Sequence, residues 1–565
     1  MPSGKILRLA CPLVVALAWP LVAQNSVPSA PPTAGDQRSS PAAPRKSLTF
    51  EEFVDATIAQ ERRLTKLIRH FKPVIETYIQ NQKQDSDVQT SPKDDVYFLS
   101  RLRLDGTALS SREFETSGRS RGRKKSRRNA EVFAAGDFAQ EVFPDFDHFD
   151  RQNYEFKLVR WEMLGEVRCI VIDVTPREAT DNRGFMGRIW VEDQDNNIVR
   201  FTGTHTAKAY ARHSFHFDSW RLNTLGNMWM PAYIYTQESG LNDPSSRGLW
   251  FKAQTRIWGY DLQQAGDHRE YAKRLTDNPV AVDPNRREAS QNLSPNLTVG
   301  TSAYTPEDNV VERLQLAGLM APDGDVDRIL ETVVNNLLVT NNLDIAGVHC
   351  RVLLTTPLES FVIGRTIVVS RGLLDVLPDE ATLAAVVAHE LAHIVLNHSL
   401  AREYASRYRL FFPDLETYTK LDFRFDAAKE AEADSKGQEL FSKSPYADKI
   451  ASVERFLQVL EARSPQLPNL LRAHLSTDFG SSHFVAMRAI GSAKNLQVDH
   501  ADQMAALPLG SRIKLDPWSD RIEILTAQSP PPMTAADKRP FEVSPFFPYL
   551  KRLAEPKATP AGTSP

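Results

Sequence analysis

Cysteine is scarce in this chain, since its 565 residues include only three. Three thiols exclude a disulfide-stapled scaffold and any four-cysteine zinc or iron-sulfur cluster. An excess of charge of one sign is also lacking, because 68 basic residues face 71 acidic ones and the formal net charge is -3. That balance gives no global electrostatic basis for binding nucleic acid. Any metal chemistry must therefore use His, Asp and Glu, and any binding must come from a local site.

Long hydrophobic runs are missing after residue 23. The one long apolar run, from Leu9 to Ala23, follows Lys5 and Arg8 and is too short for a comfortable membrane span. It is typical of a signal-peptide core, so we expect a protein of an extracytoplasmic compartment, periplasmic or secreted. Leu21 stands where a cleavage site prefers a small residue. Attachment to a membrane through an uncleaved segment therefore stays open as the alternative.

Proline exceeds glycine, 36 residues against 26, and the excess gathers in connecting segments. Two folded domains remain once these segments are set aside. The sequence predicts, in order, a signal peptide at 1–23, a disordered tether at 24–47, an N-terminal helical and β-rich domain at 48–265, a linker at 266–302, a second, mainly helical domain at 303–535 and a Pro/Ala-rich tail at 536–565.

The predicted secondary structure of the first domain changes along its length. Apolar residues from 50 to 82 recur at helical spacing, and Pro73 predicts a break between two helices. From 154 to 262, short β-rich runs separated by turn residues predict an antiparallel meander, with Asp-Asn-Asn at 195–197 as one hairpin turn. This stretch resembles in pattern the half-open β-barrels of the periplasmic lipoprotein carriers of the LolA and LolB type. The resemblance implies an apolar concavity for acyl chains; a β-domain without a ligand is the alternative.

Removal of the signal peptide would leave two cysteines, Cys169 and Cys350. They could pair in an oxidising compartment, or they could be two buried small hydrophobic side chains. The predicted boundaries put them in different domains, which makes pairing the less direct interpretation.

The second domain contains a segment with metal-site spacing, LPDEATLAAVVAHELAHIVLNH. Pro378 and Asp379 are start signals for a helix that is apolar almost all round and therefore belongs in a core. His389 and His393 are four residues apart, so both rings can reach one ion, and Glu390 can accept a proton from a metal-bound water. Chance would produce such a pattern in a chain this long with a probability on the order of 0.02. Two core histidines without a metal are the alternative.

A catalytic zinc needs a third protein ligand and an open position. His398 would lie about 140° from His393 round a continuing helix, so we expect it to pack or cap rather than to bind the same ion. Glu430 and Asp434 lie four residues apart on one face of a predicted alanine-rich helix. One of them could bind the metal while the other orients a histidine ring, and Glu432 points elsewhere.

The sequence HELAHIVLNH, followed about forty residues later by EAEADSKG, resembles a zinc metallopeptidase family. That family includes the CAAX prenyl endopeptidases, the HtpX membrane proteases and the periplasmic BepA-type proteases. The resemblance covers about residues 305–500 and implies a single Zn2+ per chain. The implied roles are zinc ligand for His389, His393 and Glu430, general base for Glu390, and proton donor or supporting group for Asp434.

Two further segments extend this resemblance. TTPLESFVIGRTIVVSRGLLDVLPDE is similar to the family's edge strand, along which an extended substrate can pair by β-addition. Glu359-Ser360-Phe361 stands there in place of the usual Asn-Ala-Phe. STDFGSSHFVAMRAI offers His483 and Arg488, and BepA-type relatives carry a comparable histidine that can approach the zinc. The resemblance thus adds His483 to the candidate catalytic residues, with an ordinary surface or core histidine as the alternative.

Taken together, the sequence predicts an α+β multidomain protein. A mainly helical gluzincin-type catalytic domain with a small edge β-sheet follows a helical segment and an antiparallel β-rich, half-barrel-like domain. We expect a zinc-dependent metalloendopeptidase that hydrolyses proteins or peptides outside the cytoplasm, with envelope proteins or lipoproteins as candidate partners. The rival is a carrier or chaperone for lipoproteins or outer-membrane proteins with a latent zinc site. A carrier requires an apolar cavity in the β-rich domain, whereas a filled core favours an accessory domain.

Overall fold

The chain divides into two compact units, Met1–Leu48 and Thr49–Pro565. Every helix and strand that the computed structural model describes lies within the second unit. The described residues are 48–85, 89–105, 108–113, 138–177, 184–205, 215–225, 228–238, 250–260, 306–321, 324–398, 423, 425–471, 513–516, 521–524, 541–545 and 547–552.

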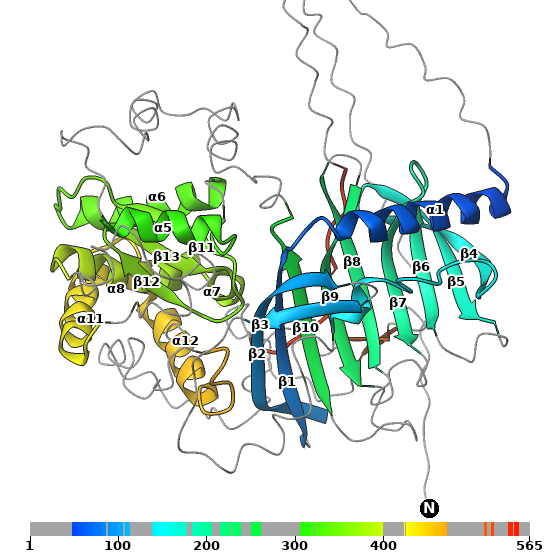
Figure 1. Cartoon of the computed structure of the whole chain (residues 1–565). Helices are drawn as coiled ribbons and strands as arrows, with labels where there is room; N and C mark the ends of the chain where they lie inside the picture. Colours follow the sequence, from blue (N-terminus) through cyan, green and yellow to red (C-terminus); the bar gives the residue numbers. More distant parts are fainter. Residues whose placement is uncertain are drawn as a thin grey trace, which may run out of the picture. The chain divides into compact units, whose positions relative to one another are not determined.

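A ten-stranded antiparallel sheet dominates the first half of the second unit (Figure 1). The strand order is β3-β2-β1-β10-β9-β8-β7-β6-β5-β4, so β4 to β10 follow one another as a meander, and β1 to β3 extend it beyond β10. The hairpin predicted at 195–197 is confirmed, because Asn196 adopts a left-handed backbone with φ of 61° between β6 and β7. The strand bounds are β1 Val74–Asp85, β2 Gln89–Asp105, β3 Ala108–Glu113, β4 Tyr154–Leu164, β5 Val167–Pro176, β6 Phe185–Glu192, β7 Ile198–His205, β8 Phe215–Leu225, β9 Met228–Glu238 and β10 Phe251–Trp258.

The prediction of two helices between 50 and 82 is wrong for the second of them. Helix α1 covers Phe50–Ile68, but the residues after Pro73 form strand β1 between β2 and β10. Val74, Ile75, Tyr78 and Ile79 are all buried, and they fall into four separate apolar clusters. A strand that is covered on both faces has apolar residues at adjacent positions, and such pairs imitate helical spacing.

Helix α1 begins with a capping box in which the Thr49 side chain accepts from the Glu52 backbone and Glu52 accepts from the Thr49 backbone. Its apolar residues, including Phe53, Val54 and Ile58, pack against one face of the sheet in a cluster with residues of nine of its strands. The 3-10 helix η1, Ala139–Val142, belongs to the same cluster. The described part of this face is therefore filled by side chains of the protein itself.

Helices dominate the second half, around a three-stranded sheet of order β11-β13-β12 (Figure 1). Strand β11 pairs parallel to β13, and β12 pairs antiparallel to it. A large antiparallel sheet followed by a helical region with a small sheet agrees with the expected α+β class. The bounds are α5 Pro306–Leu316, α6 Asp325–Thr340, β11 His349–Leu353, β12 Ser360–Ile363, β13 Thr366–Ser370, α7 Arg371–Val376, α8 Glu380–Val395, α11 Ala427–Ser442, η5 Ala447–Lys449, α12 Ile450–Arg463 and the two-stranded pair β14 Ile513–Asp516 and β15 Arg521–Ile524.

Two buried carboxylates of the large sheet accept hydrogen bonds from the helical half. Glu76 accepts from the backbone and the hydroxyl of Thr356, each at 2.6 Å, and burial raises the pKa of Glu76. Asp95 accepts from the backbone of Leu470 at 2.7 Å and from Asn469, and burial raises its pKa to about 6. The loop between β11 and β12 is thus tied directly to strand β1.

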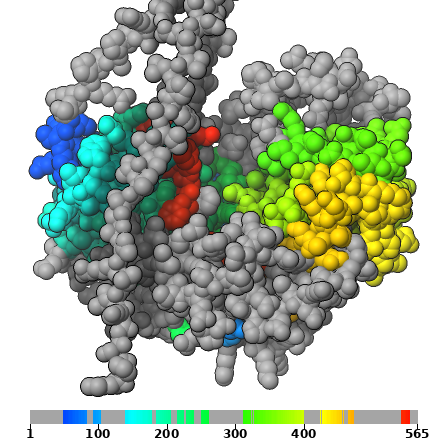
Figure 2. Space-filling model, turned by 180° about the vertical axis from the view of Figure 1, so that it is seen from behind, coloured from blue at the N-terminus to red at the C-terminus, as the bar shows by residue number. Residues whose placement is uncertain are grey.

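Part of the segment predicted as a Pro/Ala-rich tail packs on the large sheet. Figure 2 shows residues of this segment in red against the blue-green atoms of the sheet. Phe541, Val543 and Leu550 are buried, and the backbone of Glu166 donates to Leu550 at 2.8 Å. Arg552 forms an ion pair with the buried Glu192. The composition of this segment predicted only a tail, but apolar and ionic contacts hold part of it on the sheet.

The state of Cys169 and Cys350 and the apolar character of the helices bear on two further predictions. Cys169 and Cys350 are both buried free thiols, which agrees with the hydrophobic alternative rather than with a disulfide. Among the described residues, none of the helices combines the length and apolar character that a membrane crossing requires.

Candidate metal centre

Helix α8 carries the two histidines into the core. Asp379 caps its N-terminus by accepting from the backbone of Thr382 at 2.8 Å, as the start signals predicted. Every residue from Ala381 to His393 is buried, so the helix has no solvent face over this length. Imidazole rings in such a place need polar partners, because a buried polar group without one costs free energy.

Helix α11 supplies those partners and lies very close to α8. Asp426 caps it by accepting from the backbone of Lys429 at 3.0 Å. A Cβ added at Gly437 would lie only 3.0 Å from the Cα of His389, so any larger residue there would push the two helices apart by a few tenths of an ångström. The small residues of this helix allow the close packing, and it brings Glu430 and Asp434 to the histidines.

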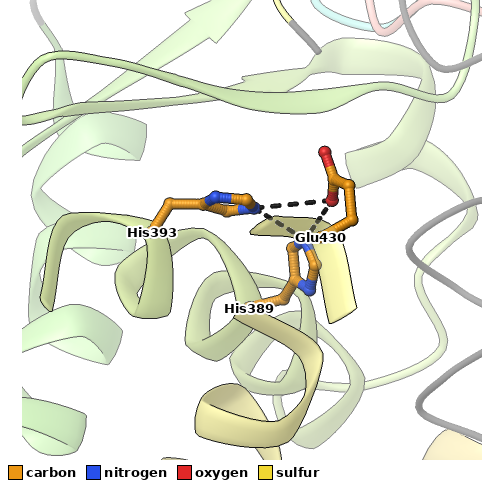
Figure 3. A group of neighbouring side chains, drawn as sticks. All are labelled: His389, His393 and Glu430. Carbon is orange, nitrogen blue, oxygen red and sulfur yellow. Dashed lines mark hydrogen bonds and ion pairs between the residues drawn. The ribbon is translucent and has the colours of Figure 1, made fainter. Parts of the chain in front are cut away.

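His389, His393 and Glu430 converge on one point (Figure 3). Nε2 of His389 lies 3.2 Å from Nε2 of His393, and Oε2 of Glu430 lies 3.3 Å and 3.5 Å from these two nitrogens. Ligands about 2.0–2.1 Å from a tetrahedral zinc are separated from one another by about 3.3 Å. The three side chains therefore form a triangle of the size that one zinc ion requires.

Each member of the triangle is held from outside it. Oδ1 of Asp434 lies 2.8 Å from Nδ1 of His389, on the far side of the ring from Glu430. The backbone of Phe425 donates to Oε1 of Glu430 at 3.2 Å, which turns Oε2 toward the histidines. The Phe425 ring stacks on His393 with centroids 4.2 Å apart. Burial lowers the pKa of His393, which favours the neutral imidazole that a metal binds.

Glu390 lies beside the triangle and has a partner that sequence reasoning did not find. The hydroxyl of Ser360, the first residue of β12, donates to Oε1 of Glu390 at 2.7 Å, and both residues are buried. The sequence showed Ser360 only as a departure from a family pattern. A hydroxyl at that position of an edge strand next to the HExxH helix was the available signal.

His398 does not lie where a continuing helix would put it. Helix α8 ends at Val395, and Asn397 has a left-handed φ of 57°, so the chain turns back. Nδ1 of His398 lies 3.0 Å from Nδ1 of His393, and its Nε2 lies 3.3 Å from Oε2 of Glu432. The expected angle of about 140° is wrong because the helix ends before His398, whereas the expectation that His398 packs rather than binds the same ion agrees with its contact to the His393 ring. Glu432 contacts the His398 ring rather than the triangle. His483 and Arg488 lie outside the described residues.

Comparison with known proteins connects this geometry to one family. Residues 322–412 match the family described as Peptidase family M48, and this segment includes helix α8. The match supports a metallopeptidase. No curated protein matches the sequence.

Two solved structures are similar to the part of the chain that they cover. One is a putative outer membrane lipoprotein-sorting protein domain from Vibrio parahaemolyticus, with 12% identity, a TM-score of 0.21, and coverage of 39% of this chain and 97% of that chain. The other is a DUF1329 family protein from Desulfovibrio piger, with 9% identity, a TM-score of 0.19, and coverage of 38% and 98%. Likeness at this level does not assign a function.

Proposed function

We propose that this protein is a zinc-dependent metalloendopeptidase. The observation that carries the proposal is the triangle of His389, His393 and Glu430, whose three separations of 3.2, 3.3 and 3.5 Å match the ligand spacing of one tetrahedral zinc. The match of residues 322–412 to Peptidase family M48 supports the same reaction class. Other divalent ions accept these donors, so the family resemblance provides the preference for zinc.

Each residue around the triangle has a separate role in peptide hydrolysis. A bound zinc ion would supply Lewis-acid polarisation of the scissile carbonyl and lower the pKa of a water molecule. Glu390 takes a proton from the attacking water and delivers it to the leaving amine. The hydroxyl of Ser360 fixes Oε1 of Glu390 and leaves the second oxygen for that proton. Asp434 orients the His389 ring, a role that its 2.8 Å contact supports.

The substrate is an extended stretch of protein or peptide. Within the described residues, strand β12 occupies one edge of the three-stranded sheet, and Ser360 at its start contacts Glu390. An edge strand offers backbone groups for β-addition, so a peptide paired there would lie next to the general base. The signal-like segment before residue 24 supports an extracytoplasmic location, and proteins of the cell envelope are the expected substrates in a quality-control role.

The large sheet serves this peptidase as an accessory domain. Its α1-covered face is filled by residues of α1, η1 and the strands, which is the packing expected of an accessory domain rather than of a carrier. The carrier hypothesis predicts acyl lipid bound to the protein as isolated from its native envelope. Mass spectrometry of such a preparation that finds a stoichiometric lipid would favour the carrier over the accessory domain.

The direct test compares the wild type with Glu390→Gln. Removal of a general base lowers the rate roughly 10²- to 10⁴-fold, while zinc binding should remain because Glu390 is not a ligand of the triangle. Caseinolysis and zinc content by mass spectrometry measure the two effects. Glu439→Gln, on the exposed side of α11, is the matched control and should leave both unchanged. Full activity in Glu390→Gln would contradict the proposed mechanism, and a wild type without bound metal would contradict the site.

A further inference from the structure

Helix α8 ends in a turn that reverses the chain directly behind a metal-site histidine. Leu396 is the C-cap, and Asn397 takes the left-handed conformation that asparagine tolerates better than most residues. The backbone of Asn397 donates to Ile394 at 3.0 Å, and the backbone of His398 donates to His393 at 2.8 Å. These two bonds form a Schellman motif, and they fix the position of His398 relative to the last helical turn.

The reversal places the His398 ring against the outer nitrogen of His393. The Nδ1 atoms of the two rings are 3.0 Å apart, whereas Nε2 of His393 faces His389 and Glu430. The His398 side chain is 7% exposed, so water competes little for this contact. Its own Nε2 lies 3.3 Å from Oε2 of Glu432, whose side chain is 65% exposed. A line of contacts thus runs from the metal-site ring through His398 to the surface.

The position of the proton on each ring determines which nitrogen donates and which accepts in this line of contacts. A ring that offers Nε2 to a metal carries its proton on Nδ1, so His393 must donate from Nδ1. His398 can accept that proton's hydrogen bond only with an unprotonated Nδ1, which puts its own proton on Nε2, toward Glu432. The arrangement is consistent throughout, with one donor and one acceptor at each contact.

We propose that His398 is a positioning residue for the metal ligand His393. It accepts the Nδ1 hydrogen bond that holds the His393 ring in the metal-binding tautomer and orientation, and so raises metal affinity. The inference rests on the proposed zinc site and adds to it a group supplied by the C-cap of the same helix. At the other histidine, Oδ1 of Asp434, on a different helix, lies 2.8 Å from Nδ1 of His389. Both histidine ligands then have a partner at the outer nitrogen.

A matched pair of substitutions separates this role from packing. His398→Asn places a carbonyl oxygen close to the position of Nδ1, whereas His398→Leu has nearly the same shape as asparagine and offers no acceptor. We expect His398→Leu to weaken zinc binding roughly 10- to 100-fold, and His398→Asn to keep most of the wild-type affinity. The measurement is the zinc dissociation constant of the metal-free full chain, from competition with a fluorescent chelator, with thermal unfolding of each metal-free variant alongside.

The outcomes distinguish three situations. Wild-type affinity in His398→Leu would overturn the inference, and so would equal weakening of both variants, because that pattern indicates packing. If His398→Leu does not fold, His398→Phe keeps a ring beside Phe425, 5.8 Å away in the native protein, and takes its place in the comparison. If the wild type binds zinc and is active, and the variants bind zinc equally tightly, only the role of His398 is refuted. A wild type that binds no zinc removes the proposed function as well.

Discussion

Buried carboxylates occur in both halves of the molecule, but they are satisfied in different ways. Glu61 of α1 receives both terminal nitrogens of Arg221 on β8, each at 2.6 Å, and the two side chains are 2% and 1% exposed. Glu430 instead faces the imidazole rings of His389 and His393. The buried carboxylate that packs on the sheet is therefore paired with an arginine of that sheet. The carboxylate of the metal centre lies beside two imidazole nitrogens that could bind a cation together with it.

This difference separates a structural use of buried charge from a binding use. A bidentate arginine pair neutralises both partners within the fold and anchors α1 to the sheet. The imidazoles that bind a metal are neutral, so in the metal-bound state the cation itself would relieve the cost of burying the Glu430 carboxylate. The following substitutions test the comparison, beginning with the largest expected effect.

Replacement of the charged Glu430 carboxylate should reduce the zinc affinity more than any other substitution. Structural zinc sites in zinc-finger peptides bind with about 10–16 kcal/mol shared among their ligands. If one ligand here contributes about 4 kcal/mol, Glu430→Gln should weaken binding by on the order of a thousandfold. Chelator competition on metal-free protein measures the change. Thermal unfolding of the metal-free protein should change little, because the wild-type carboxylate is buried there without its cation. A zinc affinity equal to that of the wild type would show that Glu430 is not a ligand.

Removal of charge from the sheet pair should affect folding and leave metal binding alone. Glu61→Gln leaves the Arg221 guanidinium buried without a counter-charge, and we expect a loss of about 3 kcal/mol in the free energy of unfolding. Urea denaturation measures it. The double variant Glu61→Leu with Arg221→Met is the control, because an apolar pair of similar volume should recover most of the stability. A reduced zinc affinity in Glu61→Gln would break the proposed separation of the two regions.

The support of His389 should have a smaller effect than a ligand itself. Asp434→Ala removes the carboxylate 2.8 Å from Nδ1 of His389 and should weaken zinc binding roughly 10- to 100-fold. Asp434→Asn keeps an acceptor oxygen and should recover part of that loss. The same chelator competition applies. Equal affinity in all three proteins would mean that Asp434 does not orient the ring.

The smallest effect is expected on the outer side of α11. Glu439 is exposed and contacts Lys436 and Lys443 at 2.7 and 2.6 Å, and these lysines lower its pKa to about 2. Its contribution to stability is present above its ordinary pKa of 4.5 and is lost as the pH falls toward 2. At neutral pH Glu439→Gln should leave the zinc affinity unchanged and lower the unfolding midpoint less than any substitution above, because water and salt screen exposed pairs. A clear shift of either would contradict this view of the helix.

Sequence patterns were most informative where one local rule governed the outcome. Asp379 marks the start of α8, because a short polar side chain satisfies the first backbone donors of a helix. Asn196 marks a hairpin because it tolerates a left-handed backbone. The four-residue spacing of His389 and His393 gives their shared direction from helix geometry alone.

The same patterns failed where partners distant in the sequence determined the result. Residues 74–82 have helical spacing but form a strand, because apolar clusters cover both faces of β1. Ser360 and His398 meet the site through an edge strand and a helix end. Asn397 was the available signal for His398, since asparagine commonly follows a helix C-terminus.

The donor set could be predicted from the amino-acid sequence alone: with three cysteines and one His-Glu-x-x-His segment, the expected metal site uses histidine and carboxylate. The amino-acid sequence also predicts the helices that carry those donors, because caps and periodicity are local. The completion of a triangle of 3.2 to 3.5 Å by Glu430, and the contacts of Asp434 and His398 with the outer nitrogens of the two histidines, depend on the packing of the folded chain. Those distances depend on how closely two helices pack, and Gly437 at their contact sets that approach.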